Sequence, residues 1–180
     1  GDAYSDTMKQ RVIEYIKNEF GGKIDLFVYS LAAPKRNDPR SEKVWRSVLK
    51  PIDQSVTGEN IDLEHERLFT ETIAPATPEE IQGTAKVMGG EDWEWWIQAL
   101  KEAHVLADNF KTVLYSYIGP QMTYPFYHEG TLGVAKTQAE RSAERINQEL
   151  KPLQGRALVC VSTVVTTKAS VVIPIMPKYM

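Results

Sequence analysis

Tyr127 and Lys136 are the residues of this chain whose types and spacing most suggest chemistry. They follow a stretch, residues 112–118, that has the β-branched and aromatic composition of a strand. A phenol held beside an ammonium can give a proton or a hydrogen bond to an oxygen that becomes negative during hydride transfer. The ammonium also favours the phenolate, so we expect Lys136 to lower the pKa of Tyr127. The pair therefore predicts a reductase site at the end of this strand.

The spacing of the two residues constrains the structure that carries them. Each residue of a helix turns the chain by about 100°, so one straight helix would place Tyr127 and Lys136 on opposite sides. Gly130 and Gly133 lie between them. We therefore expect Tyr127 to project from a loop or distorted turn, and a helix that begins near residues 131–133 to carry Lys136 on its first turns. Taken alone, the pair would also fit an unrelated tyrosine and lysine on a surface segment.

The wider sequence resembles that of one known family. The segment reads Tyr115-Ser-Tyr-Ile-Gly-Pro120, then Thr123-Tyr-Pro125, then Tyr127 to Lys136, and two further blocks at 28–34 and 75–93 agree with it. Together these blocks resemble the trans-2-enoyl-CoA reductases and the FabV-type enoyl-acyl-carrier-protein reductases, over residues 1 to about 179. Three separated blocks in the same order make this resemblance specific.

The resemblance implies an activity and three catalytic residues. It implies NADH-dependent reduction of the 2,3 double bond of trans-2-enoyl thioesters, carried by CoA or by acyl-carrier protein, in fatty acid synthesis. Tyr127 would donate to the thioester oxygen, and Lys136 would hold the hydroxyls of the nicotinamide ribose. Tyr117 matches a second tyrosine that influences catalysis, although a core or rim aromatic is an equal reading of it. By the same resemblance we expect a monomer. The single cysteine, which allows no intrachain disulfide, fits the cytoplasmic location that we expect.

The resemblance also implies contacts to the cofactor NADH. Asp2 and Ala3 match a dipeptide that meets the adenine, and Thr167 matches a residue near the nicotinamide carboxamide. Without the resemblance, each of these would be read as ordinary packing. One departure from the family is Tyr4, where many relatives have phenylalanine, and we expect its extra hydroxyl to change little. The complete set of cofactor-binding residues expected from the resemblance is Asp2, Ala3, Ser30, Leu31, Ala32, Lys136 and Thr167.

Composition excludes several other classes of protein. The 180 residues carry a formal net charge of −3, and the basic residues are scattered, so we expect no nucleic acid partner. The histidines stand far apart and Cys160 is the one cysteine, so we expect no metal site and no intrachain disulfide. Cys160 lies in an apolar stretch, where we expect a buried and inert thiol. The apolar runs are too short for stable membrane insertion.

The order of elements predicts a single α/β domain, which is a Rossmann-like parallel sheet with flanking helices. Strand 24–31 reads as apolar enough to be buried on both faces. The polar stretch 33–72 is too long for an ordinary connection, and we expect it to be an insertion near the substrate site with a hairpin of 48–56 and 60–69. We expect the three tryptophans of 93–96 to pack in the core or in an acyl groove. The predicted helices are 5–20, 78–88, 92–103 and 131–150, and the other predicted strands are 112–118 and 157–164.

A glycine-rich turn between a strand and a helix, which holds the pyrophosphate in dinucleotide-binding folds, is missing from this sequence. We therefore expect an incomplete fold without the first βαβ phosphate-binding unit, and an interior part of a longer enzyme. Two alternatives remain open. One is a carbonyl-reducing short-chain dehydrogenase, whose tyrosine and lysine usually stand four residues apart on one helical face. The other is a folded core that is catalytically incomplete by itself.

Overall fold

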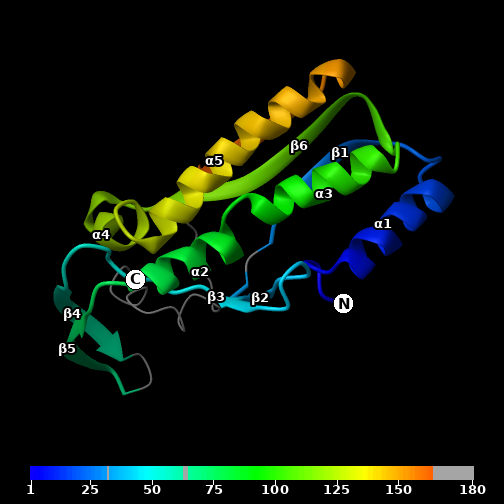
Figure 1. Cartoon of the computed structure of the whole chain (residues 1–180). Coiled ribbons are helices and arrows are strands. Elements are labelled where there is room, and N and C mark those ends of the chain that lie inside the picture. The colour runs from blue at the N-terminus through cyan, green and yellow to red at the C-terminus, as the bar shows by residue number, and fades with distance from the viewer. Residues whose placement is uncertain (32, 63–64, 164–180) are drawn as a thin grey trace.

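The computed structural model describes residues 1–31, 33–62 and 65–163 of the chain (Figure 1). Its centre is a sheet of three parallel strands in the order β1-β6-β7, with helices along one face. The predicted α/β class with a parallel sheet is confirmed. The three strands of this sheet are β1 (Ile24–Tyr29), β6 (Leu106–Ile118) and β7 (Arg156–Thr163). The helices are α1 (Asp6–Glu19), α2 (Pro78–Met88), α3 (Glu91–Glu102), α4 (Tyr124–Tyr127) and α5 (Thr131–Leu150), with short 3-10 turns at Gln121–Thr123 and Lys151–Leu153.

Local signals fix the ends of these helices. The Ser5 side chain accepts a hydrogen bond from the backbone of Met8 and caps α1. Thr77 and Glu80 form a reciprocal capping box at the start of α2, where Pro78 occupies the first turn. Helix α5 begins directly after Gly130, as the sequence predicts. These signals are local in the chain, which is why the helix boundaries agree closely with expectation.

The core lies between the helices and the sheet, and the tryptophans of α3 contribute to it. Trp93 is fully buried, and its indole nitrogen donates to the hydroxyl of Thr112 on β6 at 2.8 Å. The hydroxyl of Thr112 in turn donates to the carbonyl of Phe27 on β1 at 2.9 Å, which ties α3 to two strands. Trp96 is also buried, whereas Trp95 is half-buried. The expected core packing is thus confirmed for Trp93 and Trp96.

The opposite face of the sheet is uncovered among the described residues. Strand pairing aligns Val28 with Val113 and Leu158, and side chains two positions away share their face. On this open face Leu26 is 55% exposed, Val28 43%, Tyr115 55% and Leu158 47%. Cys160 pairs with Tyr115 and is exposed too. Two expectations are therefore wrong, because strand 24–31 is covered on one face only and Cys160 is not buried.

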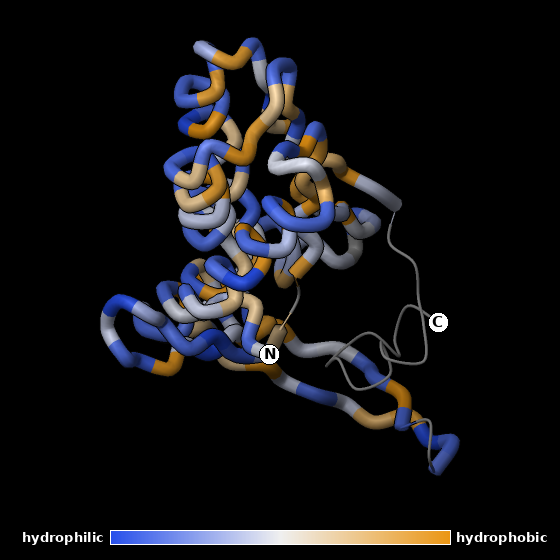
Figure 2. The backbone as a smooth tube through the Cα atoms, turned by 90° about the vertical axis from the view of Figure 1, so that its right-hand side faces the viewer, coloured by the Kyte–Doolittle hydropathy of each residue, from blue (hydrophilic) through white to orange (hydrophobic). Residues whose placement is uncertain are grey.

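The insertion 33–72 forms two antiparallel hairpins instead of the one that was predicted. Strands β2 (Lys35–Asn37) and β3 (Val44–Arg46) form the first. Strands β4 (Val56–Asp62) and β5 (Arg67–Ile73) form the second, which extends away from the body of the molecule (Figures 1 and 2). The predicted hairpin of 48–56 and 60–69 is wrong in position, since Gly58 lies inside β4 opposite Glu71 and not in a turn.

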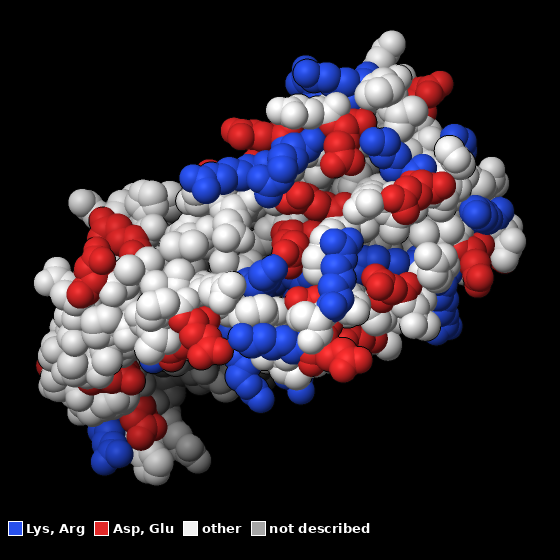
Figure 3. Space-filling view, viewed as in Figure 1, with Lys and Arg blue, Asp and Glu red and all other residues white. Residues whose placement is uncertain are grey.

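Charged side chains of both signs are interspersed over the helical face of the molecule (Figure 3). Several of them form ion pairs, such as Lys86 with Glu91 at 2.5 Å and Arg145 with Glu94 at 2.6 Å. This face therefore has no broad region of one sign over its described part. Among the described residues, no helix is both long and apolar enough to cross a membrane.

Candidate active site

The junction between α4 and α5 sets the positions of Tyr127 and Lys136. Tyr127 is the last residue of the one-turn helix α4, and Lys136 lies in the second turn of α5. A Cβ atom at Gly133 would collide with the carbonyl oxygen of His128, and one at Gly130 would lie 2.7 Å from the carbonyl oxygen of Lys50. Both glycines are therefore needed for the close approach of backbone at this junction. The expected break in the helix between the tyrosine and the lysine is confirmed.

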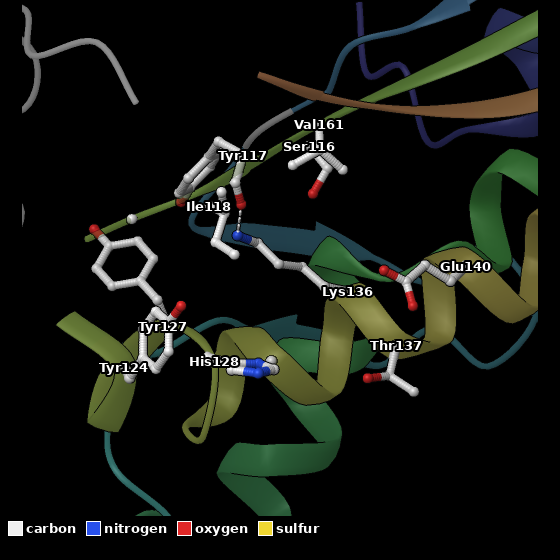
Figure 4. Close-up of a pocket in the computed structure, with 12 residues that line it drawn as sticks. Ser116, Tyr117, Ile118, Tyr124, Tyr127, His128, Lys136, Thr137, Glu140 and Val161 are labelled. Atoms are coloured by element: carbon white, nitrogen blue, oxygen red, sulfur yellow. Dashed lines mark hydrogen bonds between the residues drawn. The ribbon is translucent and has the colours of Figure 1, made fainter. Parts of the chain in front are cut away.

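Three predicted residues come together at this junction (Figure 4). The rings of Tyr117 and Tyr127 meet edge to face, with their centroids 5.7 Å apart. The Nζ atom of Lys136 lies 4.0 Å from the centroid of the Tyr117 ring and 5.8 Å from that of Tyr127. The Lys136 ammonium also donates a hydrogen bond to the carbonyl oxygen of Tyr117. Strand β6 and helices α4 and α5 thus bring two phenols and one ammonium to one place.

A cavity of about 180 Å³ opens between these residues at the carboxyl end of β6. Ligands of parallel α/β folds bind at this end of the strands. The cavity is also lined by side chains that were not predicted from the sequence as site residues, among them Tyr124 and Glu140. Glu140 could have been found from its spacing, because it stands one helical turn after Lys136. The side chains around the cavity include Ser116, Tyr117, Tyr124, Tyr127, Lys136, Glu140 and Val161.

Burial controls the ionisation of the three central groups. It lowers the pKa of Lys136 to about 8, and the negative charge of Glu140 opposes this change. Burial raises the pKa of Tyr127, and it raises that of Tyr117 to about 12 with a further contribution from Tyr127. The expectation that Lys136 lowers the pKa of Tyr127 is therefore wrong in this structure. The loss of water around the phenol outweighs an ammonium that is aimed at the carbonyl of Tyr117.

A second cavity, of about 500 Å³, lies beside the carboxyl end of β1. It is lined by Asp2, Ala3 and Leu31, three of the residues expected from the resemblance to bind the cofactor. Ser30 is exposed and directly follows β1. Asn37 was not predicted as a site residue, yet it lines this cavity and its side-chain amide donates to the carboxylate of Asp2 at 3.1 Å. Ala32 and Thr167, two further residues of the expected cofactor-binding set, lie outside the described residues.

The described residues contain no group of histidine, cysteine, aspartate or glutamate side chains arranged to hold a metal ion. His65 and His128 are exposed, and His65 bonds locally to Asp62 at 2.9 Å.

Solved structures with similar folds define the class of the protein. The chain matches a crystal structure of the trans-2-enoyl-CoA reductase of Clostridium acetobutulicum in complex with NADH, with a TM-score of 0.92 and 46% identity. It matches that of Treponema denticola in complex with NAD at a TM-score of 0.90 and 46% identity. These matches cover 99% of this chain and 45% and 44% of those chains. The fold is therefore of the Rossmann-like α/β reductase class.

Sequence comparison identifies the family within that class. The family model described as "Trans-2-enoyl-CoA reductase catalytic region" matches residues 1–180, so the chain belongs to this family. It is 51% identical over 179 residues to an enoyl-[acyl-carrier-protein] reductase [NADH] of Saccharophagus degradans. It is also 51% identical to a trans-2-enoyl-CoA reductase [NADH] of Clostridium perfringens. The chain spans about half the length of these curated relatives, 45% and 46%.

Proposed function

We propose that the protein containing this chain reduces the 2,3 double bond of trans-2-enoyl thioesters with NADH. The observation that carries this proposal is the convergence of Tyr127, Tyr117 and Lys136 on one cavity at the carboxyl end of β6. The cavity is smaller than the ~300 Å³ of common ligand pockets, so it suits the reacting part of a thioester better than a whole acyl-CoA. The names of the relatives support NADH as the reductant.

The residues of this chain fit NADH at two places. The cavity of about 500 Å³ beside Asp2 and Ala3 has the size and the strand-end position expected for the adenosine half of a dinucleotide. The half-buried ammonium of Lys136 has the donor hydrogens that ribose hydroxyls require. When bound, NADH supplies the hydride for reduction. The glycine-rich phosphate turn is not part of this sequence, so we expect the chain by itself to be inactive.

Tyr127 stabilises the charge that develops on the substrate. Reduction at the β carbon moves an electron pair toward the thioester oxygen, which becomes enolate-like. A donor aimed at that oxygen stabilises the transition state more than the ground state. Because burial raises the pKa of Tyr127, its phenol stays protonated at neutral pH and acts as a hydrogen-bond donor. Tyr117 packs against this ring and holds its orientation.

The insertion 33–72 supports the substrate side of this site in our proposal. Leu49 and Val56 of the insertion, and Ile73 directly after it, pack against the cluster that contains Phe126 and Tyr127. The backbone amide of Thr131, at the start of α5, donates to the carbonyl of Lys50 at 3.0 Å. A change in this insertion would therefore be transmitted to the catalytic tyrosine.

A comparison of two substrates tests the proposed function. The complete gene product should consume NADH with crotonyl-CoA, which has a 2,3 double bond, and not with acetoacetyl-CoA, which has a 3-keto group. The reverse preference would instead identify a carbonyl reductase. The wide spacing of Tyr127 and Lys136 and their location on two different helices favour the enoyl substrate. The acyl carrier, a monomeric state and a cytoplasmic location stay predictions.

A further inference from the structure

A buried ion pair lies between helices α1 and α3, away from the catalytic tyrosine. Lys9 of α1 is 2% exposed and Asp92 of α3 is 1% exposed, and their Nζ and Oδ1 atoms are 2.9 Å apart. Removing two charges from water is unfavourable, and a buried ion pair often contributes less stability than apolar side chains of similar size. Core stability alone is therefore a weak explanation for this pair.

The remaining hydrogen bonds of the pair reach one residue that lines the cavity beside Asp2 and one residue at the end of β1, just before the cavity segment. On one side, Lys9 donates to the carbonyl oxygen of Tyr4 at 2.8 Å. On the other side, the hydroxyl of Tyr29 donates to Oδ2 of Asp92 at 3.0 Å. Tyr29 is the last residue of β1, and Leu31, which lines the cavity, stands two residues after it. One carboxylate thus connects the chain start to the end of the strand.

The segment that Lys9 holds contains the residue proposed to meet the adenine. The backbone amide of Tyr4 donates to Oδ1 of Asp2 at 3.0 Å, and Asn37 donates to the other oxygen of the same carboxylate at 3.1 Å. The orientation of Asp2 therefore depends on where the backbone of Tyr4 lies. That backbone position is set by the buried ammonium of Lys9.

We propose that Lys9 and Asp92 are positioning residues for the adenosine half of the cofactor. They act through Tyr4 and Tyr29, and they fix the distance between the two segments that line the cavity. This inference rests on the proposed function, because it assumes that the cavity receives the adenosine of NADH. The nicotinamide end is held by other residues, so the pair affects cofactor affinity and not the chemical step.

A charge-neutral double variant tests this role in the complete gene product. Lys9→Met with Asp92→Asn removes both charges together and leaves no unpaired ion in the core. We expect KM for NADH and Kd for AMP to rise by the same factor, about tenfold. The value of kcat at saturating NADH and KM for crotonyl-CoA should stay within about twofold of the parent. A lower melting temperature with unchanged AMP affinity would overturn the proposal and leave the pair a purely structural element.

Two further variants keep the test decisive if the double variant does not fold. Tyr29→Phe removes one hydroxyl only, and it should raise Kd for AMP by a smaller factor without a change in kcat. The matched control is Lys101→Met with Glu149→Gln, an exposed pair whose atoms are 3.7 Å apart, and it should change none of these quantities. Equal AMP affinity in Tyr29→Phe and the parent would count against the inference.

The AMP measurement also separates this inference from the proposed function. If the parent binds AMP but does not oxidise NADH with any enoyl thioester, the proposed function fails while the variants still decide the positioning role. If the parent reduces crotonyl-CoA but the variants bind AMP normally, only the positioning role fails.

Discussion

Two lysines of this chain are withdrawn from water in different ways. Lys9 faces a carboxylate at 2.9 Å, so its charge is neutralised inside the core. Lys136 instead faces the carbonyl of Tyr117 and two aromatic rings, and burial lowers its pKa to about 8. A paired ammonium holds structure, whereas an ammonium without a full counter-charge remains available to a ligand. In our proposals the first lysine therefore positions the cofactor-binding segments, and the second takes part in the reaction.

Tyr127→Phe should lower kcat more than any other variant considered. Such a loss would support the cavity beside Lys136 as the active site. Removing a single donor to a developing oxyanion lowers kcat by about 10²- to 10³-fold, and we expect a loss of this size. KM for NADH should change little. The matched control is Tyr124→Phe, a tyrosine of the same cavity, which should retain most activity. Equal activity of the Tyr127→Phe variant and the parent would remove this phenol from the mechanism.

Lys136→Met should have the next largest effect, and it is the direct counterpart of the Lys9 variants. We expect kcat/KM for NADH to fall by about 10²-fold, because the ammonium is lost from the site itself. AMP affinity should stay unchanged, since the cavity that we propose for adenosine is lined by other residues. Steady-state kinetics and AMP titration of this variant beside the Lys9 double variant would therefore give opposite patterns. If both variants changed kcat/KM for NADH and Kd for AMP in the same way, the two lysines would not have different roles.

The pH dependence of activity gives a smaller and sharper test. Lys136 loses its proton as pH rises through about 8, so kcat/KM for NADH should fall above that pH by about tenfold per unit. Glu140→Gln should move this fall to lower pH, because Glu140 raises the pKa of Lys136.

Loss of the Lys136 proton should lower activity but raise the stability of the fold. The unfolded chain holds this proton up to about pH 10.5, whereas the folded chain holds it only to about 8. Folding therefore releases a proton between these values, and this group makes the protein more stable as pH rises through that window. Chemical denaturation at several pH values measures this contribution. Parallel loss of stability and activity above pH 8 would contradict the assignment of the kinetic change to Lys136.

Tyr4→Phe should have the smallest effect, which is a change in stability. Tyr4 is the residue whose carbonyl oxygen accepts the hydrogen bond from Lys9. The hydroxyl of Tyr4 is buried and has no hydrogen-bond partner within the described part of the chain. Removing it should raise the free energy of unfolding by about 1 kcal/mol, because an unsatisfied buried hydroxyl is unfavourable. Tyr29→Phe is the matched control, since its hydroxyl bonds to Asp92 and its loss should destabilise the fold. Urea denaturation of both variants measures the two changes.

Sequence reasoning predicted the elements and the site where the signals are local. Ser5, Thr77 and Gly130 mark helix starts that follow from capping and glycine chemistry, and the structure confirms them. The spacing of Tyr127 and Lys136 required a broken helix, and the junction at Gly130 and Gly133 provides it. Such features depend on a few neighbouring residues, so one sequence is sufficient to reveal them.

Features that depend on distant contacts could not be predicted. The exposure of Leu26 and Cys160 is decided by what covers the far side of the sheet, and their apolar character gives no information about that. The Lys9–Asp92 bond joins residues 83 positions apart, and no spacing along the chain relates the two side chains. The raised pKa of Tyr127 has the same origin, because burial by several elements outweighs one nearby charge. The predicted hairpin of 48–56 and 60–69 is displaced as well, because the strands that pair in the structure are β4 (Val56–Asp62) and β5 (Arg67–Ile73).

The position of Cys160 on the open face of the sheet makes this residue a reporter. It is the one cysteine of the chain, so a maleimide dye would label a single known site. Fast labelling would mean that solvent reaches the face formed by Leu26, Val28, Tyr115 and Leu158, and slow labelling would mean that other protein shields it. The rate of one thiol reaction thus measures how the apolar side of the sheet is sheltered in solution.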